Sequence, residues 1–290
     1  MEIEVKGHSG CDIAIERRGN ELVVLKTTST PSYVPRLVRQ ALKQQQAALE
    51  EYQHIRVPRI IDIRQTDSDC CIEMDYVYSR NFVEYFEQAG FEQIQYLVNG
   101  LEMFLEREIA ESPMGTVDRK VVDDKFADVC KKTRANAALA GDAHVEWLLE
   151  RSEQAFAALP GKMEMPLGRC HGDLTFSNIL FNGNNYYLID FLDSFIESPL
   201  MDVVKLRQDT CFGWSQLMYS RPFDRVRMQM VCDRIDRDLN RYFAVRHGAW
   251  YLPLYRPMQL MNLLRVLQYA HEPRVISFLK NGINSLLDHD

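Results

Sequence analysis

The sequence lacks the long apolar stretch of a membrane-spanning helix, and its first residues lack the marks of an export signal. No window approaches about 18 consecutive apolar residues, and residues 1–6 contain neither a basic segment nor an apolar one. The seven cysteines are odd in number, scattered and without a C-x-x-C pair, which signals neither a disulfide framework nor a zinc site. We therefore expect a cytoplasmic protein with no membrane partner.

Clustered positive charge is also missing. The net charge is −7 and the isoelectric point is about 5.6. Residues 205–290 carry 13 Lys and Arg against 8 Asp and Glu, but their arginines are spaced singly among apolar residues. Nucleic-acid binding requires a concentrated basic surface, so we expect no nucleic-acid partner.

The N-terminal part alternates between apolar and polar residues in the manner of strands. Five such segments are separated by Gly, Asn and other turn residues, and one helical pattern lies between Pro31 and Pro58. The predicted strands cover residues 2–6, 12–17, 21–27, 59–64 and 70–77. The pattern predicts a small antiparallel five-strand lobe with one helix, formed by residues 1–78.

The rest of the chain, residues 79–290, is typical of a mainly helical lobe. A short strand-rich stretch, residues 168–190, interrupts it. Helical periodicity covers residues 91–111, 121–139, 142–158, 223–246, 255–271 and 274–287. The fold class predicted from the whole chain is therefore α+β.

The strand-rich stretch contains the most informative motif. His171-Gly172-Asp173 is followed by Asn178 five residues after the aspartate, and a hairpin turn then leads to Asp190 at the end of a second strand. The hairpin should bring Asn178 and Asp190 together. Phosphoryl transfer needs a group that orients the attacking hydroxyl and oxygen ligands for magnesium, and these three side chains supply both.

The pattern H-x-D-x-x-x-x-N followed by I-D-F resembles the catalytic and metal-binding loops of the aminoglycoside phosphotransferase and choline kinase superfamily, which is itself similar to protein kinases. The resemblance implies a two-lobed protein-kinase-like fold that uses ATP and Mg²⁺. By the same resemblance, Asp173 is the catalytic residue that accepts the proton of the acceptor hydroxyl. Asn178 and Asp190 are the expected magnesium ligands.

The resemblance extends to the N-terminal lobe. Lys26 ends a strand that is similar to the one whose lysine holds the nucleotide phosphates. Residues 73–77 resemble the hinge that binds adenine, where Met74 lines the pocket, Asp75 offers its carbonyl and Val77 its N–H. Asp202 is similar to an acidic residue that braces the catalytic loop.

Two features depart from the protein-kinase pattern. The loop Gly7-His8-Ser9-Gly10 is looser than G-x-G-x-x-G. The helix between Pro31 and Pro58 shows no obvious glutamate as a partner for Lys26, and its apolar face places Gln45 at the inward position. A glutamine there would hold Lys26 by a hydrogen bond without adding charge.

Structural roles compete with these functional ones. His171 is expected to be a buried histidine that orients the loop. Lys26 is alternatively a surface lysine, Asp202 a charge in the first turn of a helix, and Asp193 either a substrate contact or a solvated acid.

The leading hypothesis is an ATP-dependent kinase of a small hydroxylated molecule. Within the family, acceptors include aminoglycosides, choline, ethanolamine, homoserine and sugars. Arginines favour carboxylate or phosphate partners, so the basic C-terminal region favours a neutral or anionic acceptor, such as a sugar derivative. These arginines are Arg221, Arg225, Arg227, Arg234, Arg237, Arg241, Arg246 and Arg256. A solvated helix face explains them equally well.

The alternatives are an aminoglycoside or choline-type kinase, and a non-catalytic, pseudokinase-like nucleotide-binding regulator. Protein kinase activity is disfavoured, because Leu192 replaces the glycine that would follow Asp190-Phe191 and no A-P-E-like segment comes after it.

Overall fold

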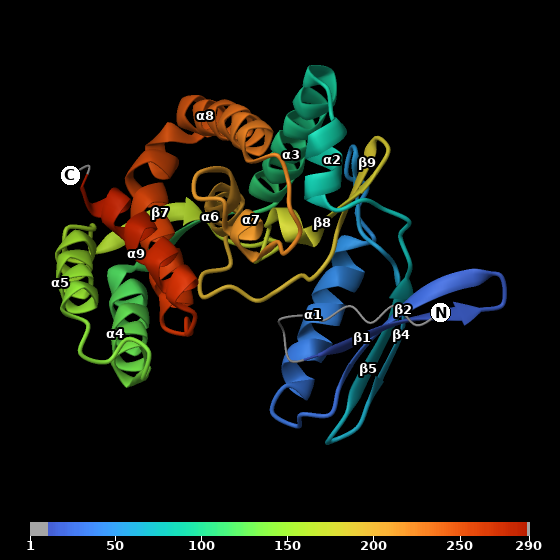
Figure 1. The fold of residues 1–290 in the computed structure, drawn as a ribbon, viewed down its shortest axis with the longest axis horizontal. Helices are drawn as coiled ribbons and strands as arrows, with labels where there is room; N and C mark the ends of the chain where they lie inside the picture. Colours follow the sequence, from blue (N-terminus) through green and yellow to red (C-terminus); the bar gives the residue numbers. More distant parts are fainter. Residues whose placement is uncertain (1–10, 289–290) are drawn as a thin grey trace. The chain divides into compact units, whose positions relative to one another are not determined.

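The computed structural model describes residues 11–288, which form two compact units (Figure 1). Of the described residues, the first unit contains 11–107, 171–194 and 223–228. The second contains residues 108–170, 195–222 and 229–288. The lobe boundary proposed at residue 78 stays a prediction.

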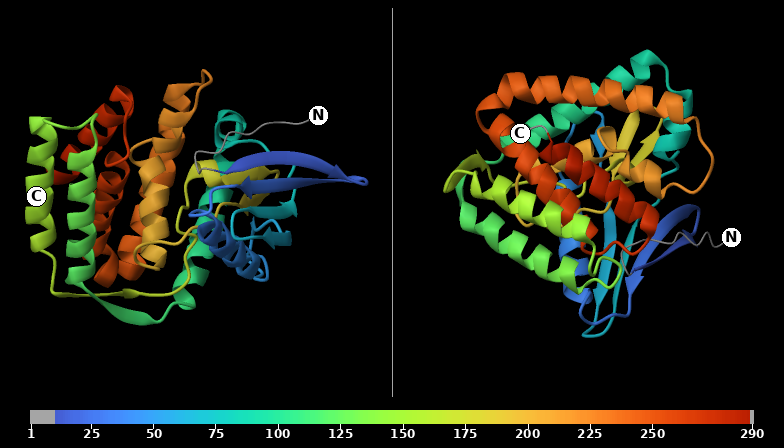
Figure 2. Two further views of the ribbon diagram at one scale, coloured as in Figure 1. Left: turned by 90° about the horizontal axis from the view of Figure 1, so that it is seen from below. Right: turned by 60° about the vertical axis from the view of Figure 1, so that its left-hand side comes forward.

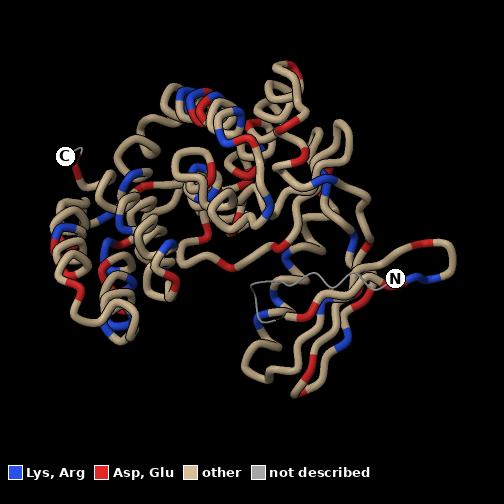
Figure 3. Tube along the Cα trace, in the orientation of Figure 1, with Lys and Arg blue, Asp and Glu red and all other residues tan. Residues whose placement is uncertain are grey.

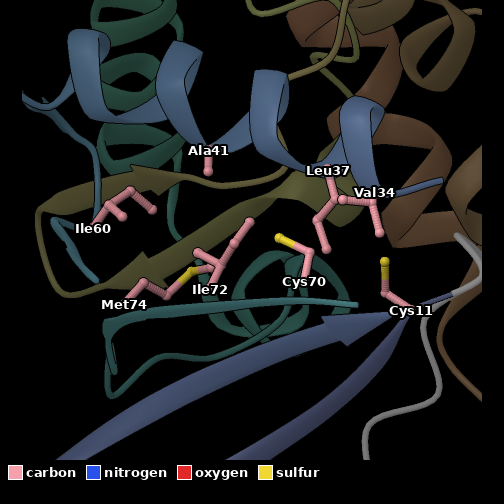
Figure 4. Close-up of a cluster of buried hydrophobic side chains, with 8 residues drawn as sticks. All are labelled: Cys11, Val34, Leu37, Ala41, Ile60, Cys70, Ile72 and Met74. Carbon is pink, nitrogen blue, oxygen red and sulfur yellow. The ribbon is translucent and has the colours of Figure 1, made fainter. Parts of the chain in front are cut away.

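A four-stranded antiparallel sheet and one helix form the N-terminal part of the first unit. The strand order is β1-β2-β5-β4, with β1 at Asp12–Arg18, β2 at Glu21–Thr28, β4 at Ile60–Gln65 and β5 at Cys70–Asp75. Helix α1, Val34–Ala47, directs Val34, Leu37 and Ala41 toward Ile72 and Met74 of the sheet (Figure 4). The strand predicted at residues 2–6 lies outside the described residues.

The rotation of α1 differs from the prediction, which was wrong at Gln45. That residue is exposed, and so is Leu42, which had been assigned to the apolar face. The buried polar residues are Gln40 and Gln44. Gln44 Nε2 donates a hydrogen bond to the carbonyl of Pro58 at 3.0 Å. This bond satisfies the buried amide, which does not need Lys26 as a partner.

A three-stranded sheet forms the other part of the first unit, in the order β3-β9-β8. β3 is Ile55–Arg56, β8 is Ile179–Asn182 and β9 is Asn185–Leu188. Helix α2, Phe82–Gln88, begins at a capping box formed by Asn81 and Glu84. The ring of Tyr85 on α2 stacks on Phe181 of β8 at 4.4 Å, so an aromatic contact fixes the β8–β9 hairpin. Helix α3, Phe91–Ala110, follows α2.

The second unit is mainly helical. Its helices are α4 (Arg119–Ala135), α5 (Ala143–Ala157), α6 (Pro199–Thr210), α7 (Trp214–Met218), most of α8 (Arg225–Leu267) and α9 (Pro273–Leu287). Helices α4, α5 and α9 lie side by side (Figure 2). The predicted α+β fold class, with strands concentrated near the N-terminus and helices toward the C-terminus, is confirmed.

Two details of this unit differ from the predictions. Strands β6 (Met114–Asp118) and β7 (Lys162–Pro166) form an antiparallel pair, although Pro113 and Gly115 had indicated only a helix break. The two helices expected between residues 223 and 271 join into α8, with a kink at His247, where φ is −124° and ψ is 18°. Across residues 11–288, none of the helices combines the length and apolarity needed to cross a bilayer.

Candidate active site

Lys26 and Asp190 form an ion pair in the first unit. The Lys26 Nζ lies 2.7 Å from Asp190 Oδ1, and Lys26 is only 5% exposed. Lys26 pairs across the sheet with Ile72, and directly opposed residues of an antiparallel pair share one face. That face is covered by α1, because Ile72 belongs to the core beneath the helix. Lys26 is therefore not a surface lysine.

Asp173 and Asn178 are joined through a short 3₁₀ turn, Phe176–Asn178. The Asn178 Nδ2 donates hydrogen bonds to the Asp173 carbonyl at 2.8 Å and to Asp173 Oδ2 at 3.0 Å. Both bonds use the amide nitrogen. The Asn178 Oδ1 has no hydrogen-bond partner in the described part of the chain, and this leaves an oxygen for another ligand.

The β8–β9 hairpin brings Asn178 and Asp190 to the same end, as predicted. Its register pairs Ile179 with Leu188, and the N–H of Ile189 donates to the carbonyl of Asn178 at 3.1 Å. Asp190 has a φ of +63°, the left-handed conformation that aspartate tolerates better than most side chains. The residues around Asp190 must therefore hold it in a sparsely populated backbone conformation.

His171 fixes the catalytic loop to this strand end. Its side chain is fully buried, and Nε2 donates to the carbonyl of Ile189 at 2.8 Å. Its Nδ1 accepts a hydrogen bond from the N–H of Asp173 at 3.2 Å, which requires the tautomer protonated at Nε2. Burial lowers the pKa of His171 to about 4. The expectation of a buried histidine that orients the loop is confirmed.

Three further residues complete the site, and none of them was assigned a role in it from the sequence. Gly172 has a φ of +87°, and a Cβ there would lie 2.0 Å from the carbonyl oxygen of Leu192. The N–H of Leu192 donates to the His171 carbonyl at 2.9 Å. The Lys43 Nζ on α1 donates to the Leu192 carbonyl at 2.7 Å. The motif H-G-D could have pointed to Gly172, whereas Lys43 required the correct rotation of α1.

The predicted hinge residues lie apart from this cluster. Met74 is buried in β5, and Asp75 ends the strand with its N–H donating to the carbonyl of Arg59 at 3.0 Å. Val77 follows the strand, and its N–H makes no hydrogen bond within residues 11–288. No hydrogen bond or ion pair in the described chain joins these three residues to Asp173, Asn178 or Asp190. Met74 faces Val24, two residues before Lys26.

The donor set fits a magnesium ion carried by a nucleotide. Magnesium prefers oxygen ligands, and in nucleotide sites it is bound by one or two protein groups together with phosphates and water. Asn178 offers Oδ1 and Asp190 its carboxylate, while Lys26 adds a positive charge beside them. No group of three or more His, Cys, Asp or Glu side chains in the described chain is arranged as a metal site.

Comparisons with known proteins give a family match and a shared fold. Residues 117–260, which contain Asp173, Asn178 and Asp190, match the model of the phosphotransferase enzyme family. A solved structure titled as the GDP and kanamycin complex of APH(2")-IIia has a TM-score of 0.64 at 13% identity, and the alignment covers 99% of this chain and 92% of that one. The relationship to the aminoglycoside phosphotransferase and choline kinase superfamily is confirmed.

Other solved structures share the fold. The GDP complex of wild-type aminoglycoside 2'-phosphotransferase-IIIa has a TM-score of 0.64 at 13% identity, covering 100% of this chain and 93% of that one. A glucosamine kinase has a TM-score of 0.58 at 15% identity, covering 94% and 76%. No curated protein matches the sequence. Identities this low show a shared fold and do not identify the substrate.

Proposed function

We propose that this protein transfers the γ-phosphoryl group of ATP to a hydroxyl group of a small molecule, with magnesium bound to the nucleotide. The observation that carries the proposal is the arrangement of two bonded side-chain pairs, Lys26–Asp190 and Asn178–Asp173. A backbone hydrogen bond from Ile189 to Asn178 joins them at the end of the β8–β9 hairpin. The match to the phosphotransferase enzyme family over residues 117–260 supports it. Positioning and charge stabilisation account for most of the catalysis in this reaction class.

Each residue has a distinct role in the proposal. Asp173 orients the acceptor hydroxyl and accepts its proton as the oxygen attacks phosphorus. Asn178 and Asp190 hold the magnesium ion, which, when bound, neutralises the developing charge on the phosphate oxygens. Lys26 places its ammonium group against the phosphates, and its pairing with Asp190 keeps that group in place before the nucleotide arrives.

The nucleotide base is proposed to bind at the end of β5. The Val77 N–H and the Asp75 carbonyl are the backbone groups that would meet the edge of adenine, and Met74 would line the pocket. The availability of the Val77 N–H supports this assignment. Because two of the similar structures are GDP complexes, GTP is the second nucleotide to test.

The acceptor is proposed to be neutral or anionic, such as a sugar or a sugar acid. Along the first half of α8, however, basic residues are interspersed with acidic ones (Figure 3). Several of the arginines that suggested an anionic acceptor are already engaged: Arg227 with the Phe86 and Ala89 carbonyls, Arg234 and Arg241 with Asp238, Arg246 over Tyr242, and Arg256 with the Leu286 carbonyl. Amino sugars, aminoglycosides and choline therefore belong in the same test.

The regulator hypothesis is the second candidate. It is motivated by α1, whose buried polar residues are Gln40 and Gln44 and not a glutamate that could pair with Lys26. The presence of Asp173, Asn178 and Asp190 in one cluster counts against a loss of catalysis, so we favour the enzyme.

The proposal is tested by incubating the purified protein with Mg²⁺, either ATP or GTP, and a panel of hydroxylated metabolites. Mass spectrometry then identifies any acceptor that has gained a phosphoryl group. We expect acceptor-dependent product with the wild-type protein and little with Asp173→Asn. Tight nucleotide binding without phosphorylation of any class of acceptor would favour the regulator instead.

A further inference from the structure

The segment that carries Asp190 is bonded to α1 by a residue outside the His171-Gly172-Asp173 motif. Lys43, one turn after Gln40, donates from its ammonium group to the Leu192 carbonyl at 2.7 Å. Leu192 lies two residues after Asp190, and its own N–H donates to the His171 carbonyl at 2.9 Å. The same peptide segment is thus bonded both to the catalytic loop and to the helix.

The backbone of Asp190 depends on the groups that flank it. Asp190 has a φ of +63°, and hydrogen bonds on both sides of it in the chain hold this conformation. On the N-terminal side, His171 bonds to the Ile189 carbonyl. On the C-terminal side, Leu192 bonds through its N–H to the His171 carbonyl and through its carbonyl to Lys43. A residue in a sparsely populated conformation persists only where its surroundings over-determine it. Removing the bond on the Leu192 side should let the Asp190 carboxylate move away from Asn178.

Two basic residues of α1 contact this segment, and they differ in burial. Arg39 Nε lies 2.9 Å from Asp193 Oδ2, but both side chains are at least half exposed. Exposed ion pairs contribute little because solvent screens them. Lys43 is half-buried and makes a charge-assisted hydrogen bond to a main-chain carbonyl, which is a stronger interaction.

The Leu192 carbonyl packs closely against the backbone of Gly172. A Cβ at Gly172 would lie 2.0 Å from the Leu192 oxygen, the atom that also accepts from Lys43. The position of the oxygen is therefore limited by the catalytic loop and fixed by α1. The same carbonyl mechanically links Lys43, the loop of Asp173 and the segment of Asp190.

We propose that Lys43 is a positioning residue for the metal site: by holding the Leu192 carbonyl, it keeps the Asp190 carboxylate in place to bind magnesium with Asn178. This inference rests on the proposed function. It extends the site to α1, since the hydrogen bond from Lys43 to the Leu192 carbonyl would transmit a displacement of that helix to Asp190.

The test measures binding of Mn²⁺, as a paramagnetic substitute for Mg²⁺, in the presence of a non-hydrolysable ATP analogue. Electron paramagnetic resonance reports the free Mn²⁺. We expect Lys43→Met to weaken Mn²⁺ binding by about 10–100-fold, the usual loss when a partner that orients a metal ligand is removed. Lys43→Arg, which keeps a charged donor, should restore most of the affinity.

Arg36→Met is the matched control, because Arg36 lies two turns earlier on α1, is exposed and contacts the ring of Tyr33. It should bind Mn²⁺ as the wild type does. If Lys43→Met does not fold, Lys43→Gln replaces it, since glutamine removes the ammonium group but suits a half-buried position.

Each outcome decides the inference. A purely structural role would lower the melting temperature without changing the Mn²⁺ affinity of the folded protein. The inference would be overturned if the folded Lys43→Met or Lys43→Gln protein bound Mn²⁺ within about twofold of the wild-type affinity. It would also be overturned if Lys43→Arg and Lys43→Met lost equal Mn²⁺ affinity. If the wild type itself shows no nucleotide-dependent Mn²⁺ binding, the proposed function fails, and this inference fails with it.

Discussion

Substitution of Gly172 by alanine should create a closer contact than the same change at any other glycine of residues 11–288. The added Cβ would lie 2.0 Å from the Leu192 carbonyl oxygen, whereas ordinary contact begins at 3.4 Å. The obstructing atom belongs to the backbone, which cannot rotate away as a flexible side chain would. Either the catalytic loop or residues 190–193 must therefore move by more than an ångström.

The cost follows from two physical contributions. A Cβ in the left-handed conformation costs about 1–2 kcal/mol, and the φ of Gly172 is +87°. Displacing the Leu192 carbonyl also breaks its charge-assisted bond with Lys43, and hydrogen bonds to charged groups contribute about 1.5–3 kcal/mol. The free energy of unfolding should fall by roughly 2.5–5 kcal/mol in total.

Gly19→Ala separates the two contributions. Gly19 has a φ of +64°, in the turn between β1 and β2, but no atom lies within 4 Å of a Cβ built there. This variant experiences only the backbone strain of about 1–2 kcal/mol. Urea unfolding of both variants, followed by circular dichroism, should show the larger loss for Gly172→Ala. If the two variants lose the same free energy of unfolding within about 0.5 kcal/mol, close to the error of such comparisons, contact with the Leu192 carbonyl adds nothing to the loss at Gly172.

Four further outcomes follow from the site. Asp173→Asn should retain nucleotide affinity but lower kcat by about 10²–10⁴, the usual contribution of a general base; turnover near the wild-type rate would exclude that role. Asp190→Ala should abolish the Mg²⁺ dependence of nucleotide binding in calorimetry, whereas unchanged Mg²⁺ dependence would show that Asp190 is not a ligand. Lys26→Met should raise the KM for ATP while folding is retained, and a collapse of thermal stability with normal KM would mark the residue as structural. Because burial lowers the pKa of His171 from 6.5 to about 4, the unfolded chain takes up a proton in this window and the folded one does not. Stability should therefore decrease by up to about 3 kcal/mol as the pH falls from 6.5 to 4. His171→Gln should flatten this slope in urea unfolding, and an unchanged slope would exclude His171 as its source.

The site was predictable where its geometry is local. The hairpin turn at residues 182–185 and the apolar alternation on both sides fix the register of β8 and β9. Asn178 and Asp190 must then meet at one end. Lys26 could be predicted only by family resemblance, because nothing local in β2 tells a buried lysine from a surface one.

The parts that were not predicted depend on tertiary contacts. Helix α1 was rotated wrongly because Leu42, an apolar residue, is exposed, while Gln44 is buried by its bond to the Pro58 carbonyl. No pattern within the helix reveals a partner 14 residues away. Lys43 was missed for the same reason, since its contact with Leu192 becomes visible only after the helix is correctly oriented.

The most direct test of the account is a single-turnover experiment. Protein in excess over γ-labelled ATP and Mg²⁺ is mixed with an acceptor found in the metabolite panel, and the label is followed in wild type and in Asp173→Asn. The wild-type protein should move the label from ATP to the acceptor. The Asp173→Asn protein should bind ATP equally well but transfer the label about a hundredfold more slowly, or slower still. Transfer at equal rates in the two proteins would contradict the assigned chemistry, and bound ATP whose label never leaves the nucleotide in wild type would contradict phosphoryl transfer itself.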